Sequence, residues 1–306
     1  MAFKLNKNDR RILFSIADCR VLTQSQIAAI QMRSKQVVRR RMRAMENEGL
    51  IHSSTQRLAG FRGRPEKIFS LSKKGVHFLE LDDTQTKSIL QRINEDNFRF
   101  LDHQLLINWF QIHLRYMEKT CPALSFRFLS SSSYLLARDD NNRPFTSEQK
   151  PDSEYTENTH GFTPDGVFSL SHNDNRKTLL FFLEVDLGSE SLFSPKRKAG
   201  DIRKKILNYQ SYFRNGRYKR YGKIWNCEFK GFRLLFLTNT HGRLVALCKL
   251  VRQTPPSNFI WLTTQEKMFS YGLSARIWFS GGKLAESPQS ILGTKIQFKS
   301  NLPFGE

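Results

Sequence analysis

Cysteine is scarce in this sequence, and the few cysteines are far apart. The 306 residues contain four, Cys19, Cys121, Cys227 and Cys248, with no CxxC pair and no histidine cluster beside them. Disulfide-stapled secreted domains and zinc sites require closely spaced ligands, so both classes are disfavoured. A reducing compartment suits such a chain, and we expect a cytoplasmic protein.

Long apolar runs are also missing. None reaches the roughly 18 residues that a membrane-spanning helix needs, and the opening MAFKLNKNDRR has no apolar segment behind its charges. We therefore expect neither secretion nor membrane insertion. A hydrophobic content of 39% with 25 Phe still supplies a core, and 306 residues suggest two globular domains.

Acidic residues are few compared with basic ones. The chain has 49 Lys and Arg against 28 Asp and Glu, a net charge of +21. Residues 1–75 hold 17 Lys and Arg against 5 Asp and Glu, so more than half of the excess lies in the first quarter. This charge predicts a polyanionic partner, by default nucleic acid, that binds mainly the N-terminal part.

Three helices are predicted in the first 50 residues. The first follows from the helical spacing of its apolar residues, and the second begins at the N-cap Thr23. Ser34 caps the third helix, and Gly49 ends it. The inward-facing residues are Ile12, Leu13 and Ile16 of the first helix and Val38, Met42 and Met45 of the third.

Two strand-like runs, LIHSSTQ and KIFSLS, follow these helices and are separated by the turn-rich RLAGFRGRPE. A short closing helix is expected in KKGVHFLELDD. The segment RGRPEKIFSLSKKG resembles winged-helix DNA-binding proteins, in which such a hairpin forms a wing. We assign residues 1–82 to a winged helix-turn-helix domain and residues 83–96 to a helical linker.

The arginines of this domain are predicted to bind double-stranded DNA. Those of the third helix lie beside its apolar stripe, where they can meet phosphates and base edges in a major groove. Those of the wing tip can enter a narrow minor groove. The two sets are Arg39, Arg40, Arg41 and Arg43 on the helix, and Arg62 and Arg64 on the wing. The alternative is a solvated charged face on a domain that contacts protein.

The remaining chain predicts a mixed α/β (α+β) domain over residues 97–282. A long amphipathic helix at 96–119 and a strand at 125–137 are followed by strands at 165–170 and 178–186. A helix at 197–213 and an apolar strand at 231–239 complete an αβββαβ order, and a further helix, strand and short helix extend to 272. Residues 283–306 are expected to form a peripheral tail.

Three carboxylates stand at the ends of two of these strands. Asp165 opens the first, and Glu184 and Asp186 close the second, on one face because side chains alternate. Clustered carboxylates repel one another unless a cation such as Mg²⁺ or Mn²⁺ neutralises them, and such a metal supports phosphodiester cleavage. The alternative is that these acids are exposed strand ends with no joint role.

This segment resembles the PD-(D/E)XK nuclease superfamily, through Pro164-Asp165, Glu184 and the αβββαβ order over residues 97–264. The resemblance implies a lysine two residues after Glu184, where this chain has Asp186. Lys205 on the following helix is the predicted replacement, with Lys204 second.

The winged N-terminus together with TPDGVF, FFLEVDLGSE and KKILNYQSYF resembles the replication-relaxation family, which includes MOBC-type plasmid relaxases, over most of residues 8–260. That family implies recognition of an origin on mobile DNA and metal-dependent nicking of one strand. It also implies help from an accessory mobilisation protein and a coupling protein. The resemblance assigns these roles to Asp165, Glu184 and Asp186. His103 falls where the family's first core helix has a histidine, so it could bind DNA or orient a ligand; the alternative is a structural histidine.

Other mechanisms remain open. Tyr209 or Tyr212 could attack the phosphate and stay joined to the DNA end. The second domain could instead be inactive and serve dimerisation or partner contact in a replication or transcription regulator. A restriction or defence nuclease that makes double-strand breaks is a third alternative, which requires paired active sites and hence a homodimer.

Overall fold

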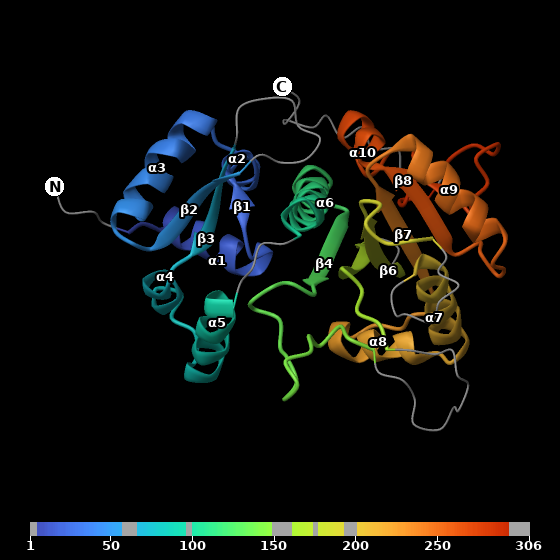
Figure 1. The fold of residues 1–306 in the computed structure, drawn as a ribbon, viewed down its shortest axis with the longest axis horizontal. Coiled ribbons are helices and arrows are strands. Elements are labelled where there is room, and N and C mark those ends of the chain that lie inside the picture. The colour runs from blue at the N-terminus through green and yellow to red at the C-terminus, as the bar shows by residue number, and fades with distance from the viewer. Residues whose placement is uncertain are drawn as a thin grey trace. The chain divides into compact units, whose positions relative to one another are not determined.

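The computed structural model describes residues 5–56, 66–95, 100–148, 161–173, 177–192 and 201–293. The chain divides into two compact units, the first made of residues 1–112 and 132–145 and the second of residues 113–131 and 146–306. Figure 1 labels the elements of both units.

The first unit has the element order predicted for a winged helix-turn-helix. Three helices surround a short strand, and an antiparallel pair and two more helices follow. In order these are α1 (Lys7–Cys19), β1 (Leu22–Thr23), α2 (Gln24–Gln31), α3 (Lys35–Asn47), β2 (Ile51–Gln56), β3 (Glu66–Leu71), α4 (Lys73–His77) and α5 (Asp83–Glu95). The strands form a sheet of order β1-β3-β2.

Local signals in the sequence account for α3. The Ser34 hydroxyl accepts a hydrogen bond from the Val37 amide at the N-terminus, as an N-cap does. Gly49 follows the helix with a φ of 68°, the left-handed conformation that suits glycine. The predicted inward-facing residues Val38, Met42 and Met45 are all buried.

Helix α5 packs into the first unit and is not a separate linker. Its Ile89 is completely buried in the core formed by α1, α3 and the strands. The segment 132–145, expected in part to extend a strand, also belongs to this unit, and its Tyr134 lies in the same core. The Arg92 guanidinium of α5 donates to the carbonyl oxygens of Ser133 and Tyr134. The boundaries predicted at 82 and 96 therefore do not separate the two units.

The long helix α6 (Leu101–Thr120) passes from the first unit to the second. The second unit contains β4 (Leu124–Ser130), β5 (Gly166–His172), β6 (Lys177–Asp186), α7 (Ile202–Arg214), the 3₁₀ helix η1 (Arg217–Lys219), α8 (Arg220–Trp225), β7 (Phe232–Thr238), α9 (His241–Arg252), β8 (Ile260–Thr264), α10 (Gln265–Tyr271) and β9 (Phe279–Ser280). The predicted αβββαβ order is observed in α6 through β7, giving a mixed α/β protein.

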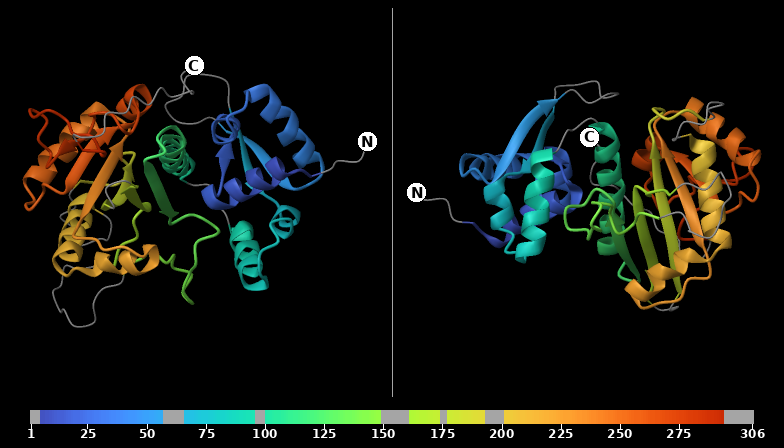
Figure 2. Two further views of the ribbon diagram at one scale, coloured as in Figure 1. Left: turned by 180° about the vertical axis from the view of Figure 1, so that it is seen from behind. Right: turned by 60° about the horizontal axis from the view of Figure 1, so that its bottom comes forward.

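The strands of the second unit form one sheet in the order β4-β5-β6-β7-β8-β9, in which β6, β7 and β8 are parallel. Helices α7 and α9 lie on one face of this sheet, and the end of α6 that belongs to the unit lies on the other (Figure 2). Strand β6 is buried along most of its length, as a central strand covered on both faces must be.

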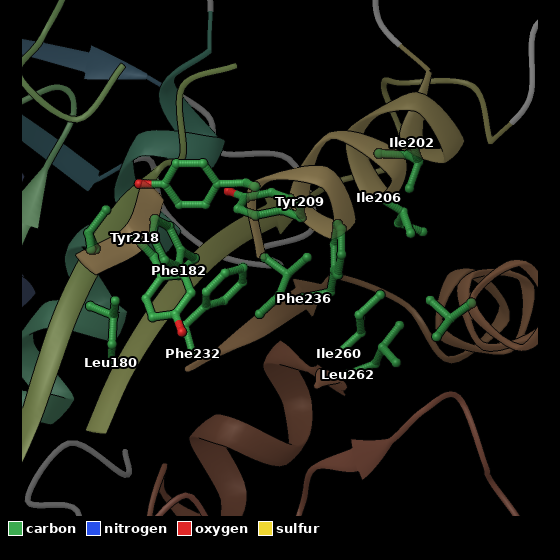
Figure 3. Packing of buried hydrophobic residues seen from close by; sticks show 14 of the residues in the cluster. Leu180, Phe182, Ile202, Ile206, Tyr209, Tyr218, Phe232, Phe236, Ile260 and Leu262 are labelled. Carbon is green, nitrogen blue, oxygen red and sulfur yellow. The ribbon is translucent and has the colours of Figure 1, made fainter. Parts of the chain in front are cut away.

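An aromatic core joins the sheet to α7 and α8. Figure 3 shows Tyr209 of α7 near Phe182 of β6, and the two ring centroids are 5.6 Å apart. Phe232 of β7 packs edge-on against Phe182, with centroids 4.7 Å apart. This packing fixes the side of α7 that faces the predicted carboxylates.

The segment after residue 282 is not wholly peripheral. Ile291 is fully buried, and Leu292 is nearly so. The Ser290 hydroxyl donates to the Ser274 carbonyl oxygen at 2.6 Å, and the backbone of Gln289 pairs with that of Trp278. Residues up to 293 therefore pack onto the second unit, and the rest of the predicted tail lies outside the described residues.

Candidate active site

The antiparallel pairing of β5 and β6 places Asp165 beside Glu184. Gly166 is opposite Leu183, so Asp165, one residue earlier, lies level with Glu184. The Asp165 amide donates to the Leu183 carbonyl oxygen at 3.1 Å, and its carboxylate Oδ2 accepts from the Val185 amide at 2.7 Å. Hydrogen bonds from Asp165 to backbone groups on both sides of Glu184 hold the two acids next to each other.

Glu184 is 1% exposed and has a partner on each carboxylate oxygen. Its Oε2 lies 3.0 Å from the Lys205 Nζ, and its Oε1 accepts from the Tyr209 hydroxyl at 2.5 Å. Lys205 and Tyr209 are four residues apart, so both lie on the same side of α7. Lys205, the predicted replacement for the missing lysine, does reach the acid.

Burial raises the pKa of Glu184 to about 7. The charge of Asp165 adds to this shift, whereas the Lys205 ammonium and the two hydrogen bonds oppose it. Burial alone lowers the pKa of Lys205, but the carboxylates of Glu184, Asp165 and Glu190 outweigh burial and raise it. Lys205 is therefore positively charged at neutral pH, whereas Glu184 titrates near neutral pH.

Glu190 is a member of this cluster that the sequence analysis did not single out. Its Oε2 lies 3.2 Å from the Lys205 Nζ, so the lysine is shared between two carboxylates. The only signal in the sequence was its presence in FFLEVDLGSE, four residues after Asp186. We name Asp165, Glu184, Glu190, Lys205 and Tyr209 the carboxylate–lysine cluster.

Asp186 is bound elsewhere, and its predicted role needs correction. Its two oxygens accept from the Arg243 Nε at 2.7 Å and Nη2 at 3.1 Å, a two-pronged ion pair that is nearly buried. The Gly188 amide also donates to Asp186 Oδ1. Among the described residues, no three His, Cys, Asp or Glu side chains are arranged to hold a metal ion. The pair Asp165 and Glu184 remains adjacent, without Asp186.

The two tyrosines considered as nucleophiles are both buried hydrogen-bond donors. The Tyr212 hydroxyl donates to Glu148 Oε1 at 2.7 Å, and the Arg220 Nη2 lies 2.6 Å from the same oxygen. Burial is the largest cause that raises the pKa of both Tyr209 and Tyr212, and the adjacent carboxylates raise it further. A phenol that holds its proton so firmly and has no exposed face is poorly placed to attack a phosphate.

The remaining site candidates are not part of the cluster. Lys204 is half-buried at the start of α7, where its backbone amide donates to the Asp201 side chain that caps the helix. His103 is half-buried on the portion of α6 that belongs to the first unit. The carboxylate–lysine cluster belongs to the second unit.

The arginines of α3 do not share one environment. Arg39, Arg40 and Arg43 are exposed. Arg41 is half-buried, and its guanidinium donates through Nε and Nη2 to the carboxylate of Asp9, which is completely buried. Asp9 also accepts from the Asn6 amide within the capping box of α1. Arg41 therefore ties α3 to α1, which corrects its assignment to DNA. Arg62 and Arg64 lie outside the described residues.

We expect Arg41→Met to lower the free energy of unfolding by about 2–3 kcal/mol, since it leaves a buried carboxylate without its cation. Arg40→Met, one residue away on the exposed side of α3, is the matched control and should stay within about 0.5 kcal/mol of the unaltered protein. Urea unfolding followed by circular dichroism measures both. Equal stability of the two variants would show that Asp9 does not depend on Arg41.

The geometry defines a class of protein: a mixed α/β chain with an arginine-bearing helix in one unit and a buried carboxylate–lysine cluster in the other. The sequence model described as replication-relaxation matches residues 13–226, more than two thirds of the chain. The protein belongs to the replication-relaxation family, which suggests a role in plasmid replication or mobilisation. No curated protein and no solved structure matches the chain.

The matched residues include the α3 arginines, Asp165, Glu184 and the whole of α7. They do not include Arg243, the partner of Asp186. Within the described ranges, no helix is both long enough and apolar enough to cross a bilayer.

Proposed function

We propose that this protein is a metal-dependent DNA endonuclease that nicks one strand at an origin of transfer during plasmid mobilisation. The observation that carries the proposal is the buried Glu184, adjacent to Asp165 and bonded to both Lys205 and Tyr209. A buried carboxylate costs several kcal/mol of solvation. Such a cost is expected at a reactive site, because the reaction requires acids and a cation to be held together.

The donor set suits Mg²⁺ or Mn²⁺ only in part. Asp165 and Glu184 supply the hard carboxylate oxygens that these ions prefer, whereas Asp186 is committed to Arg243. Asp165 and Glu184 would hold the ion, and Glu190 shares the Lys205 ammonium with Glu184. A bound ion would polarise the scissile phosphate and make a water molecule acidic.

The chain's own residues prepare this site. Tyr209 fixes one oxygen of Glu184 and so orients the carboxylate, and its aromatic surroundings exclude water from that side. The Lys205 ammonium balances the carboxylates and is placed to offset the charge that develops on the phosphate. The exposed α3 arginines would select the DNA site.

Incubating the protein with supercoiled plasmid that carries its native flanking DNA tests the proposal. Open circles should form with Mg²⁺ or Mn²⁺ and not with a chelator. Linear plasmid as the main product would favour a nuclease with paired sites. A product with protein attached to a DNA end would favour tyrosine chemistry.

A second candidate is a regulator of plasmid or phage replication or transcription, with an inactive second unit. The ion pair between Asp186 and Arg243 favours it, because buried ion pairs also occur as purely structural features. Tight DNA binding without cleavage under any divalent ion would support this candidate and exclude the nuclease.

The nicking rate should depend on pH through Glu184. Its pKa is raised to about 7, so the ionised form needed to hold a metal decreases about tenfold for each pH unit below 7. We expect the rate to rise with that slope and to level off above pH 7, and the break should move to lower pH as Mg²⁺ increases. A flat profile between about pH 5.5 and 8.5 would argue against a role for Glu184 ionisation.

A further inference from the structure

A strongly basic stretch of the second unit is left unexplained by the carboxylate–lysine cluster. Residues 202–227 hold eight Lys and Arg and no Asp or Glu. The stretch forms α7, η1 and α8. Some of its cations have acidic partners within the described residues: Lys205 contacts Glu184, and Arg220 contacts Glu148.

Three others, Arg214, Lys219 and Lys223, are exposed. Among the described residues, no ion pair or side-chain hydrogen bond involves any of them. They come from three successive elements: Arg214 ends α7, Lys219 ends η1, and Lys223 lies in α8. We name these three residues the α7–α8 basic patch.

The patch is held on a fixed framework. Gly216, with a φ of 65°, makes the turn between α7 and η1. The ring of Phe213 stacks on the buried Tyr218 at 5.7 Å and on Phe259 at 5.4 Å, so both sides of the turn are packed. Lys219 and Lys223 are four residues apart on consecutive helical turns, a spacing at which like charges repel. A bound polyanion would relieve that repulsion.

We propose that the α7–α8 basic patch binds the phosphates of the DNA strand that enters the carboxylate–lysine cluster. The choice of a DNA strand as the ligand of this patch rests on the proposed function. Arg214 is nine residues after Lys205 on the same helix, a distance of about 14 Å along the axis. One strand of a duplex carries a phosphate for about every 3.4 Å of axis, so Arg214, the patch residue on α7, lies about four phosphates from Lys205 along the helix.

The proposal gives the second unit a DNA contact of its own. The predicted DNA contacts all lie in the first unit, on α3 and the wing. A second contact would keep the strand at the cluster while the first unit holds the recognition site. It also separates two properties that mutations can address independently: where the protein binds, and how firmly the strand is held for cleavage.

The test compares two triple variants of the full chain. One is Arg214→Gln, Lys219→Gln and Lys223→Gln. The matched control is Lys249→Gln, Arg252→Gln and Arg276→Gln, which removes the same charge from exposed residues elsewhere in the second unit. Fluorescence anisotropy with a labelled duplex from the native flanking DNA measures affinity over a range of KCl, in chelator so that no DNA is cut.

The patch variant should reduce the slope of log affinity against log salt by roughly 2 to 3, as expected for three lost phosphate contacts, and the control should leave it unchanged. In the plasmid assay, the patch variant should raise KM for DNA and leave kcat within about twofold. Equal slopes for the patch variant and the unaltered protein, or equal reductions in both triple variants, would overturn the proposal.

The same measurements distinguish a failure of the proposed nicking activity from a failure of the proposed DNA binding by the patch. If the slope falls only in the patch variant but no protein cuts plasmid, the DNA-binding surface stands and the nuclease does not. If plasmid is nicked but the slope is unchanged, the nuclease stands and the patch does not bind the strand. An unaltered protein that does not bind the duplex at all would overturn both.

Discussion

Replacing Lys205 with methionine is expected to slow metal-dependent nicking by at least about 100-fold, the usual effect of removing one preorganised charge from a reaction site. Its ammonium contacts Glu184 at 3.0 Å and Glu190 at 3.2 Å, and it carries the positive charge of the cluster. Methionine keeps most of the side-chain volume, so packing of α7 should change little. The nicking rate on supercoiled plasmid is the measurement.

Lys204→Met is the matched control for this variant. Lys204 precedes Lys205 on α7, and successive helical residues point about 100° apart, so it should keep most of its activity. The two variants also decide between the two lysines that the sequence offered as replacements. A larger loss in Lys204→Met than in Lys205→Met would contradict the cluster.

The Lys205→Met deficit should shrink as pH rises. Lys205 lowers the pKa of Glu184 from the value that burial alone would give, so its loss moves that pKa further above 7. At pH 7 the variant then has less ionised Glu184, and alkaline solution restores it. A deficit independent of pH would mean that Lys205 acts only on the phosphate and not through Glu184.

Replacing the three exposed arginines of α3 by alanine is the second variant with a large expected effect. We expect Arg39→Ala, Arg40→Ala and Arg43→Ala together to weaken binding to the native flanking duplex by about 100- to 1000-fold. Each contact to a base edge contributes about 1–3 kcal/mol, and each lost phosphate contact also weakens binding. Anisotropy titrations at fixed salt measure the change.

A control must distinguish the effect of removing three positive charges from the effect of removing them on α3. The control triple Lys7→Ala, Arg11→Ala and Lys87→Ala removes the same charge from exposed residues on α1 and α5 of the same unit. It should weaken binding by less than about tenfold and leave discrimination against an unrelated duplex intact. Equal effects of the two triples would indicate general attraction to DNA and no recognition helix.

The sequence predicted features that depend on neighbours within one helical turn or one strand. The third helix followed from Ser34, its buried stripe and Gly49, and all three signals are local. The two strands that carry Asp165 and Glu184 followed from their apolar patterns, and the structure pairs them. Lys205 was proposed, with Lys204 second, because a helix that packs against the sheet can bring an ammonium back to the site.

Contacts between distant residues could not be predicted in the same way. Arg41 meets Asp9 across 32 residues, and Asp186 meets Arg243 across 57. The local sequence around each of these residues does not reveal its distant partner, so Arg41 was assigned to DNA and Asp186 to a metal. Tyr209 was considered as a nucleophile because the sequence does not show its bond to Glu184. That bond forms only when α7 packs on β6.

Unit boundaries were predicted imperfectly for a related reason. The polar surface of α5 gave no sign that Ile89 enters the core of the first unit, and the apolar residues after 282 are too widely spaced to reveal that Ile291 is buried. Burial by a distant surface leaves little periodic signal in the buried segment itself.

The most direct test of the account is nicking of supercoiled plasmid by the Glu184→Gln variant in Mg²⁺ at about pH 8, beside the unaltered protein and Asp186→Asn. Glutamine keeps the shape of the side chain but removes its charge. We expect open circles from the unaltered protein, none above background from Glu184→Gln, and a substantial residual rate from Asp186→Asn. Equal nicking by Glu184→Gln and the unaltered protein would contradict a catalytic role for Glu184.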